Sequence, residues 1–196
     1  MKQPHFITAL QALVVVALLF TVSAPATAQI DQVESNQARA LPLTPAVTVY
    51  EQDDDGHVTV RAVRISNPIV VDGQLDDPIY QAVPAIDKFI QQLPDEGAAP
   101  TERTEIWILF DEDNIYLSAR CWDSQPDRMI ANEMTRDARA MWRNELLSVV
   151  FDTFHDGRNG MSFSTNPLGG LMDNLITDES TVNLDWNTVW DVQTSL

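Results

Sequence analysis

The residues of this chain that suit ligand chemistry are aromatic and acidic rather than nucleophilic. Five tryptophans and 29 acidic residues occur among its 196 residues. Trp142, Trp186 and Trp190 lie beside polar or acidic residues near the ends of predicted strands, where an indole face can stack on a sugar ring or simply pack. Trp107 and Trp122 lie inside strand patterns, so we expect them to be packed in the core.

The acidic residues suggest two kinds of site, and neither has a diagnostic spacing. Asp152 and Asp156 flank a three-residue turn, and a glycosidase needs two carboxyl groups about 5 to 10 Å apart. Solvated turns are the interpretation we favour, because acidic residues are plentiful everywhere in the chain. Calcium is the cofactor that we consider, because it binds six to eight oxygens from loops. Its candidate ligands are Asp152, Asp156, Asn159, Asp173 and Asp178.

Motifs that define common enzyme classes are missing from the sequence. The three histidines lack the spacing of a zinc site, and no GxSxG, P-loop or GxGxxG motif is found. We therefore expect a protein without catalytic activity of its own.

Short alternating segments separated by turn residues dominate the chain after residue 58. Strands are predicted at residues 104–110, 115–122, 146–151, 161–165 and 190–194. In the second of these, Ile115, Leu117, Ala119 and Cys121 share one face, which predicts a hairpin with one buried face. Residues 127–140 fit either a helix or an extended segment. The pattern indicates an all-β protein, an antiparallel β-sandwich.

Residues 69–80 carry the densest set of local signals. A β-branched run leads into Asp72-Gly73, a strong turn signal. Pro78 suits the first position of a helix, and Asp76 or Asp77 can cap it. We expect a strand, a tight turn and a short capped helix.

The N-terminal part of the chain predicts export. Residues Ala9 to Phe20 are apolar except for one glutamine, and this run is too short to span a membrane. Ala26-Thr27-Ala28 resembles the cleavage site of a signal peptide. Residues 1–28 are therefore interpreted as a signal peptide and residues 29–60 as a flexible polar lead-in. The formal net charge of −17 argues against nucleic acid and bare anionic membranes as partners. The single cysteine, Cys121, excludes an intrachain disulfide and is expected to be buried.

Several motifs together resemble carbohydrate-binding module family 9. They are Val70-Val71-Asp72-Gly73-Gln74-Leu75-Asp76-Asp77, Phe110-Asp111-Glu112-Asp113-Asn114-Ile115-Tyr116-Leu117, and Trp142-Arg143-Asn144-Glu145 followed by Ser148-Val149-Val150-Phe151-Asp152. The likeness covers about residues 61–196, which we assign to one domain. A narrower likeness, through 98–104, 163–169 and 185–190, is to the N-terminal domain of large exported bacterial proteins with a β-rich C-terminal region, interpreted as an outer-membrane barrel. The chain stops inside a predicted strand at Leu196, so we expect a domain that is completed further along such a parent protein.

The resemblance implies a saccharide site in the periplasm or at the outer membrane. Trp142 matches a stacking tryptophan of the family and Asn166 a ligand asparagine; Trp190 is added as a candidate from its place at a strand end. The supporting acid and arginine of the family fall on Ser148 and Ser164, which removes charge-assisted hydrogen bonds to sugar hydroxyls. The leading expectation is weak glycan binding. The alternative is a periplasmic structural domain without sugar binding, and a glycoside hydrolase is the least favoured.

Overall fold

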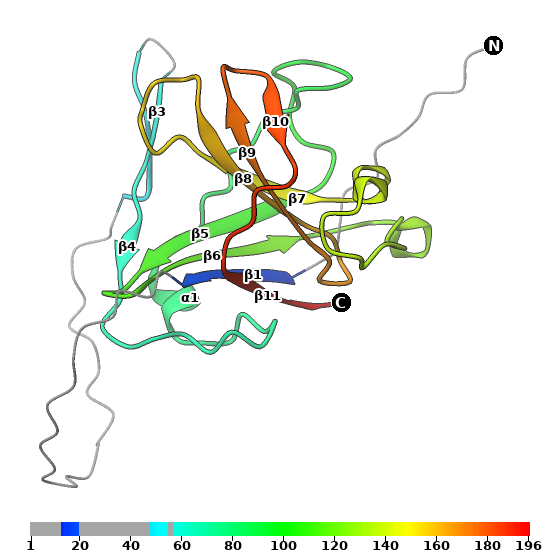
Figure 1. Cartoon of the computed structure of the whole chain (residues 1–196). Coiled ribbons are helices and arrows are strands. Elements are labelled where there is room, and N and C mark those ends of the chain that lie inside the picture. The colour runs from blue at the N-terminus through cyan, green and yellow to red at the C-terminus, as the bar shows by residue number, and fades with distance from the viewer. Residues whose placement is uncertain (1–12, 20–47, 55–56) are drawn as a thin grey trace, which may run out of the picture.

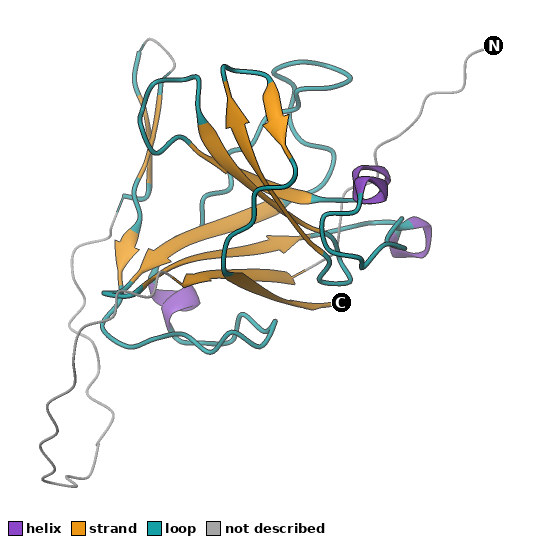
Figure 2. Ribbon diagram, in the orientation of Figure 1, coloured by secondary structure: helices purple, strands orange, loops and turns teal. Residues whose placement is uncertain are grey.

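The computed structural model describes residues 13–19, 48–54 and 57–196, and these are almost entirely strands and loops (Figures 1 and 2). One sheet has five strands in the order β11 (Trp190–Ser195), β1 (Leu13–Leu19), β6 (Asn114–Cys121), β5 (Thr104–Phe110) and β4 (Val63–Arg64). A second sheet has four strands in the order β10 (Thr181–Asn183), β9 (Leu171–Thr177), β8 (Gly160–Thr165) and β7 (Leu147–Phe151). The prediction of an all-β protein is confirmed.

The hairpin of β5 and β6 is the centre of the five-stranded sheet. Its turn forms because Asp111 Oδ1 accepts hydrogen bonds from the backbone N–H groups of Asp113 and Asn114, at 2.8 and 2.7 Å. The predicted strands at 104–110 and 115–122 match β5 and β6 to within a residue or so. The sheet is mixed rather than purely antiparallel, since β4 pairs with β5 in parallel.

The strand β1 comes from the apolar run that the sequence assigns to a signal peptide. It pairs antiparallel with β6 on one side, with Val16 opposite Leu117, and antiparallel with β11 on the other, with Val16 opposite Val192. The predicted cleavage site Ala26-Thr27-Ala28 lies outside the described residues, so removal of the leader stays a prediction. The sheet thus contains a strand from outside the predicted domain of residues 61–196.

The two sheets share one apolar core. Leu117, Ala119 and Cys121 of β6 are buried in the same cluster as Phe163 of β8 and Trp190 of β11. Phe163 meets the Trp190 ring edge-on at a centroid distance of 5.4 Å. Burial of the Cys121 thiol raises its pKa, as expected for a packed cysteine.

The other face of the five-stranded sheet is also covered over β5 and β6, which corrects the prediction of a single buried face, whereas Asp191 and Gln193 of β11 are exposed. The short helix α1 (Ile79–Ala82) lies on the side of this sheet that faces away from the four-stranded sheet (Figure 1). Tyr80 of α1 is hydrogen-bonded through its hydroxyl to Ser118 of β6, 2.9 Å away. Tyr116 and Ser118, predicted to face solvent, are therefore almost completely buried. Burial raises the pKa of Tyr80.

The turn at Asp72-Gly73 forms as predicted and packs against the end of β11. Gly73 has φ +85°, a left-handed conformation that favours glycine, and its carbonyl accepts a hydrogen bond from Ser195 Oγ at 2.7 Å. A Cβ at this position would lie 3.0 Å from the backbone carbon of Thr194. The helix that follows is N-capped by Pro78 without a side-chain hydrogen bond, so the predicted cap by Asp76 or Asp77 is wrong.

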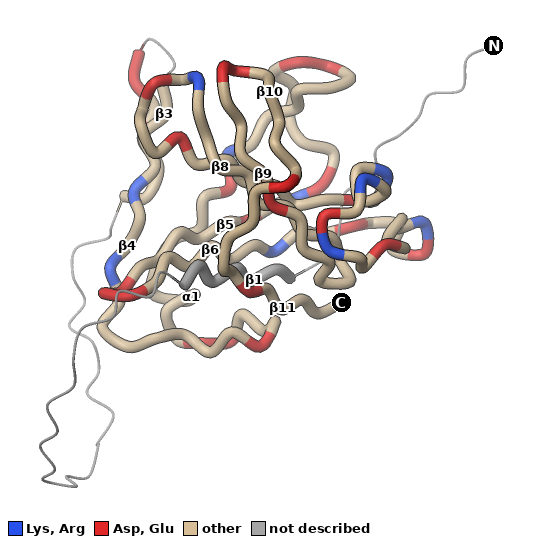
Figure 3. The backbone as a smooth tube through the Cα atoms, viewed as in Figure 1, with Lys and Arg blue, Asp and Glu red and all other residues tan. Residues whose placement is uncertain are grey.

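Three remaining segments complete the described chain. The polar lead-in ends in a hairpin of β2 (Tyr50–Gln52) and β3 (Val58–Val60), where the sequence predicted no regular structure. The undecided region around residues 127–140 is mostly loop, with the 3-10 helices η1 (Pro126–Arg128) and η2 (Arg139–Arg143) at its two ends. Most of the described acidic side chains lie in loops rather than in strands (Figure 3).

Candidate functional site

Two of the three predicted saccharide residues, Trp142 and Asn166, lie at one end of the four-stranded sheet, where the loop of residues 133–144 is bound to it. The backbone N–H of Asp137 donates to the carbonyl of Leu171 at 3.0 Å, and Asn144 Oδ1 accepts hydrogen bonds from Asn132, Glu133 and Asn166. The helix η2, which carries Trp142, is therefore held beside the turn between β8 and β9.

Asn166 is the centre of this attachment and has no polar group left for a ligand. Its Nδ2 donates to the carbonyl of Glu133 at 2.5 Å and to Asn144 Oδ1 at 3.1 Å. Its Oδ1 accepts hydrogen bonds from the backbone N–H groups of Leu168 and Gly170 at 3.1 and 2.9 Å. An amide side chain offers two donors and two acceptor positions, so all four are occupied. The side chain is 0% exposed, and its role in this geometry is to fix the turn.

The two candidate tryptophans have opposite environments. Trp142 is 53% exposed, which leaves part of its ring free for stacking. Trp190 is 5% exposed and packs in the core between the sheets, so it presents no ring face to solvent. Trp186 is partly buried against the same core. The structure therefore brings Trp142 and Asn166 together at one end of the four-stranded sheet. Trp190 does not join them, because it is buried in the core between the sheets.

The outer face of the four-stranded sheet carries polar residues, of which the sequence analysis named Ser148 and Ser164 but not Ser162 and Asn174. Ser148 of β7 lies opposite Ser164 of β8, and their hydroxyls are hydrogen-bonded at 2.8 Å. Two residues earlier in β8, on the same face of the sheet, Ser162 lies opposite Asn174 of β9. The Nδ2 atom of Asn174 is buried without a hydrogen-bond partner. The signal in the sequence was the alternation of polar residues with Met161, Phe163 and Thr165 along β8.

The exposure of this face differs from strand to strand. Ser162, Ser164 and Asn174 are nearly buried, whereas Ser148 and Val150 of β7 are exposed. Solvent therefore reaches the polar row from the β7 side. Ser148 and Ser164 bond to each other and carry no charge, and only Ser148 is exposed, so its hydroxyl is the one group of the pair that a sugar hydroxyl can contact.

The proposed calcium ligands lie in two different places. Asp173 is 0% exposed and is paired with Arg136 at 2.7 Å, while its other oxygen accepts the backbone N–H of Thr188 at 2.7 Å. Asp178 pairs with Arg158 at 3.0 Å on the surface. No group of three or more acidic, histidine or cysteine side chains suited to a metal is found among the described residues.

Asp152 and Asp156 organise the turn between β7 and β8. Asp152 accepts hydrogen bonds from the backbone N–H groups of Asp156 and Gly157, and Asp156 accepts them from Arg158 and Asn159. These hydrogen bonds lower the pKa of both carboxyl groups, most strongly through Gly157 for Asp152 and through the Asn159 side chain for Asp156. A general acid needs a raised pKa, so this pair is set up for turn formation rather than for acid catalysis.

Glu145, which lies near Asp123, has the opposite character. Burial raises the pKa of Glu145, with a smaller contribution from the negative charge of Asp123. Each residue has one carboxylate oxygen that is buried without a hydrogen-bond partner. Glu145 Oε1 accepts the backbone N–H of Ile130 at 3.3 Å, which ties β7 to the loop after η1.

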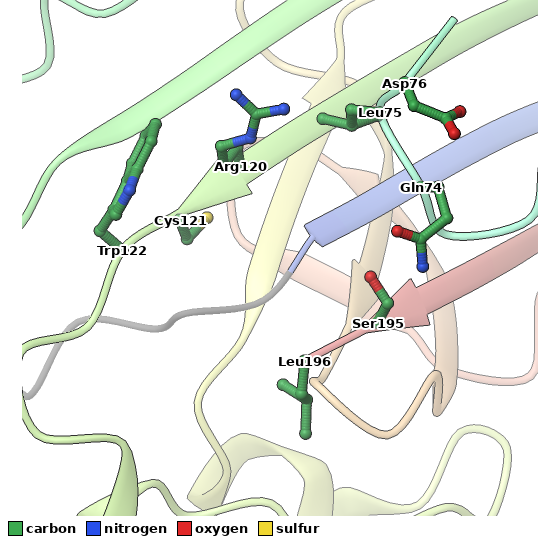
Figure 4. A pocket seen from close by; sticks show the side chains of 8 residues that line it. All are labelled: Gln74, Leu75, Asp76, Arg120, Cys121, Trp122, Ser195 and Leu196. Atoms are coloured by element: carbon green, nitrogen blue, oxygen red, sulfur yellow. The ribbon is translucent and has the colours of Figure 1, made fainter.

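A pocket of the described part of the chain lies elsewhere, at the end of β6 (Figure 4). It has a volume of about 370 Å³, and Arg120, Trp122 and Ser195 are among its lining residues. The guanidinium group of Arg103 lies 4.5 Å from the Trp122 ring centre and that of Arg120 lies 5.8 Å from it. The expectation that Trp122 is packed in the core is therefore wrong, since its ring is partly exposed and is contacted by two arginines. Trp107 is buried as predicted.

Comparisons with protein-family models, with curated proteins and with solved structures give no match for this chain. Within the described ranges, the helices are all too short or too polar to cross a membrane.

Proposed function

We propose that residues 61–196 belong to a β-sandwich of the carbohydrate-binding module family 9 type, exported to the cell envelope, that binds saccharide weakly and without catalysis. The observation that carries this proposal is the exposed ring of Trp142 at the end of a sheet whose edge strand β7 presents the exposed hydroxyl of Ser148. Stacking of an apolar sugar face on a half-exposed indole, beside hydroxyl partners, is a common way of holding a neutral ligand.

The ligand contacts that we propose differ from those expected from the family. Asn166 is excluded as a direct contact because its four hydrogen-bonding positions are filled. Ser148 takes its place as the exposed polar partner, while Asn174 is too deeply buried for a ligand to reach. The set contains no charged residue, which favours a neutral saccharide over an anionic one.

The affinity is expected to be low. One exposed aromatic ring and a few neutral hydrogen bonds are consistent with a dissociation constant on the order of millimolar, about −4 kcal/mol. The carboxylate and guanidinium that would strengthen hydroxyl binding are replaced by Ser148 and Ser164, whose hydroxyls already bond to each other.

Calorimetric titration with xylose, glucose, xylobiose and cellobiose tests the proposal. We expect heat with at least one of these sugars and its loss in Trp142→Ala. Phe154→Ala is the matched control, because Phe154 is an exposed aromatic side chain, 78% exposed, on the β7–β8 turn. Binding that is equally weakened in both variants, or no heat with any sugar, would contradict the proposal.

A second candidate function is a structural domain of an envelope protein that binds no sugar. The observation in its favour is that Asn166 and Trp190, two of the three predicted ligand residues, are buried and used in packing or turn formation. Absence of saccharide binding in a well-folded protein would select this candidate.

A further inference from the structure

The 3-10 helix η2 carries two arginines beside the exposed tryptophan of the proposed saccharide site. Arg139 is its first residue and Arg143 its last, and both side chains are exposed, as is that of Trp142 (Figure 3). A 3-10 helix has three residues per turn, so Arg139 and Trp142 lie on the same side of it. Met141 is 0% exposed and faces the protein interior, which leaves the arginines and the tryptophan on the solvent side.

Both arginines lack a partner within the described part of the chain. Five other described arginines form ion pairs, namely Arg64, Arg103, Arg120, Arg136 and Arg158. No described side chain forms an ion pair or a hydrogen bond with the guanidinium group of Arg139 or Arg143. The chain has 29 acidic residues and only 12 lysines and arginines, so carboxylate partners are plentiful. Two adjacent guanidinium groups without one are available to a negatively charged ligand.

The acidic side chains of the surrounding loop are engaged with other groups. Glu133 Oε1 accepts hydrogen bonds from two backbone N–H groups of its own turn, at 3.0 and 2.8 Å. Asp137 lies 3.4 Å from Arg136, with which it is paired. Glu145 Oε1 accepts a backbone N–H from the loop after η1 at 3.3 Å. These carboxylates are therefore held away from the two free guanidinium groups by bonds of their own.

The backbone beneath the two arginines is held in place. The N–H of Met141 donates to the carbonyl of Ala138 at 2.9 Å, and the N–H of Asn144 donates to the carbonyl of Met141 at 2.9 Å. Asn144 Nδ2 also donates to the carbonyl of Ala140 at 3.3 Å. Because Asn144 is bonded in turn to Asn166, the helix is tied to the end of the four-stranded sheet. A fixed backbone reduces the ordering cost that a ligand has to meet.

We propose that Arg139 and Arg143 form an anion subsite next to Trp142, so that the preferred ligand is a glycan with an acidic group on the unit next to a neutral sugar. The neutral unit stacks on Trp142 beside Ser148, and the arginines bind the carboxylate or sulfate of its neighbour. The planar guanidinium group offers parallel N–H donors that match the oxygens of both anions. This inference rests on the proposed saccharide site and specifies its substrate class.

The gain in affinity is expected to be moderate and dependent on salt. Exposed ion pairs contribute little each, and two of them together strengthen binding by about tenfold at low ionic strength. At a salt concentration of about 1 M the screening length falls to about 3 Å, so this gain should disappear. Stacking on Trp142 does not depend on charge, so binding of the neutral sugar should be almost unaffected by salt.

Calorimetric titration of the full chain with two matched disaccharides tests the proposal. Cellobiose is compared with cellobiouronic acid, in which one hydroxymethyl group is replaced by a carboxylate, and cellobiose sulfated at the same carbon distinguishes the two anions. We expect the acidic forms to bind about tenfold more tightly at about 20 mM salt. The double variant Arg139→Gln, Arg143→Gln should lose this preference and bind cellobiose as before. Arg61→Gln, Arg64→Gln is the matched control, because it removes the same charge from two exposed arginines before β5 and should keep the preference.

The outcomes separate this inference from the saccharide site on which it rests. Equal affinity for the neutral and the acidic disaccharides overturns the anion subsite alone, as does a preference that survives in Arg139→Gln, Arg143→Gln or is equally lost in the control pair. Absence of heat with every disaccharide overturns the saccharide site together with it. Tighter binding of either acidic form that requires both the arginines of η2 and Trp142 supports the proposal, and the tighter of the two identifies the anion.

Discussion

The substitution Gly73→Ala measures how firmly the opening turn is docked on the end of β11. Two penalties combine at this position. An alanine at φ +85° costs about 1 kcal/mol or more, because its Cβ crowds the local backbone in the left-handed region. Its Cβ would also lie 3.0 and 3.1 Å from the backbone carbon and oxygen of Thr194 and 3.3 Å from the nitrogen of Ser195.

The contact penalty is expected to be the larger of the two. Backbone atoms cannot rotate away as a side-chain end can, so the turn or the end of β11 has to move, which typically costs about 1–3 kcal/mol. The movement also stretches the 2.7 Å hydrogen bond from Ser195 Oγ to the Gly73 carbonyl. A total loss of about 2–4 kcal/mol lowers the melting temperature of a protein of this size by about 5–15 °C.

Gly97→Ala is the matched control for this experiment. Gly97 has φ +79°, but a Cβ there would meet no atom within 4 Å. It therefore carries the backbone strain alone, and the loss of unfolded-chain entropy common to both substitutions cancels in the comparison. Thermal unfolding followed by circular dichroism should show a drop at least about 1 kcal/mol larger for Gly73→Ala. Equal drops for the two variants would refute the docking of the turn on β11.

Four further predictions concern stability. Asn166→Ala should lower the free energy of unfolding by about 3 kcal/mol or more in urea titrations, because it removes the four hydrogen bonds of a fully buried side chain; a residue that only binds ligand would show almost no loss. The hydrogen bond that Tyr116 donates to Asp111 at 2.7 Å lowers the pKa of that carboxyl, so the cost of Tyr116→Phe should be present at pH 7 and shrink as the pH falls below about 4. Burial raises the pKa of Tyr116 to about 12, so one tyrosine should ionise near 12 in an absorbance titration, with stability lost as the pH rises above about 10. Calcium at a hundred times its dissociation constant should add about 2.7 kcal/mol if the acidic loops bind it, whereas an unchanged melting midpoint with calcium and with chelator would argue against a structural ion.

Local sequence signals were sufficient for the β5–β6 hairpin and for two of the turns, but not for β2, β3 and β9, and the strand expected before Asp72-Gly73 does not form. The alternation in 104–122 and the Asp111 turn depend on neighbouring residues only, so the β5–β6 hairpin could be predicted closely. The left-handed turn at Gly73 followed from the Asp-Gly pair for the same reason. The cap of α1 could not be predicted, because Asp76 and Asp77 were equally good candidates and neither side chain turns back to the helix.

The site depended on packing that spacing does not encode. Asn166 and Trp190 suit a ligand by residue type, but burial decides whether a side chain is available, and both are enclosed. Ser148 and Ser164 are 16 residues apart in the chain, and only strand pairing brings their hydroxyls to 2.8 Å. Trp122 was expected in the core because it continues the β6 alternation, yet it lies just beyond the strand, where Arg103 covers one face of its ring.

The apolar run of residues 9–20 shows most clearly where the sequence stops and the tertiary structure begins. Its composition determines that it avoids water, and that property serves a leader and an internal strand equally well. The choice of Leu13–Leu19 as β1 depends on two edges, β6 and β11, contributed by residues about 100 and 180 positions further along the chain. Backbone pairing across such separations depends on the positions of those edges in space, so only the folded structure decides it.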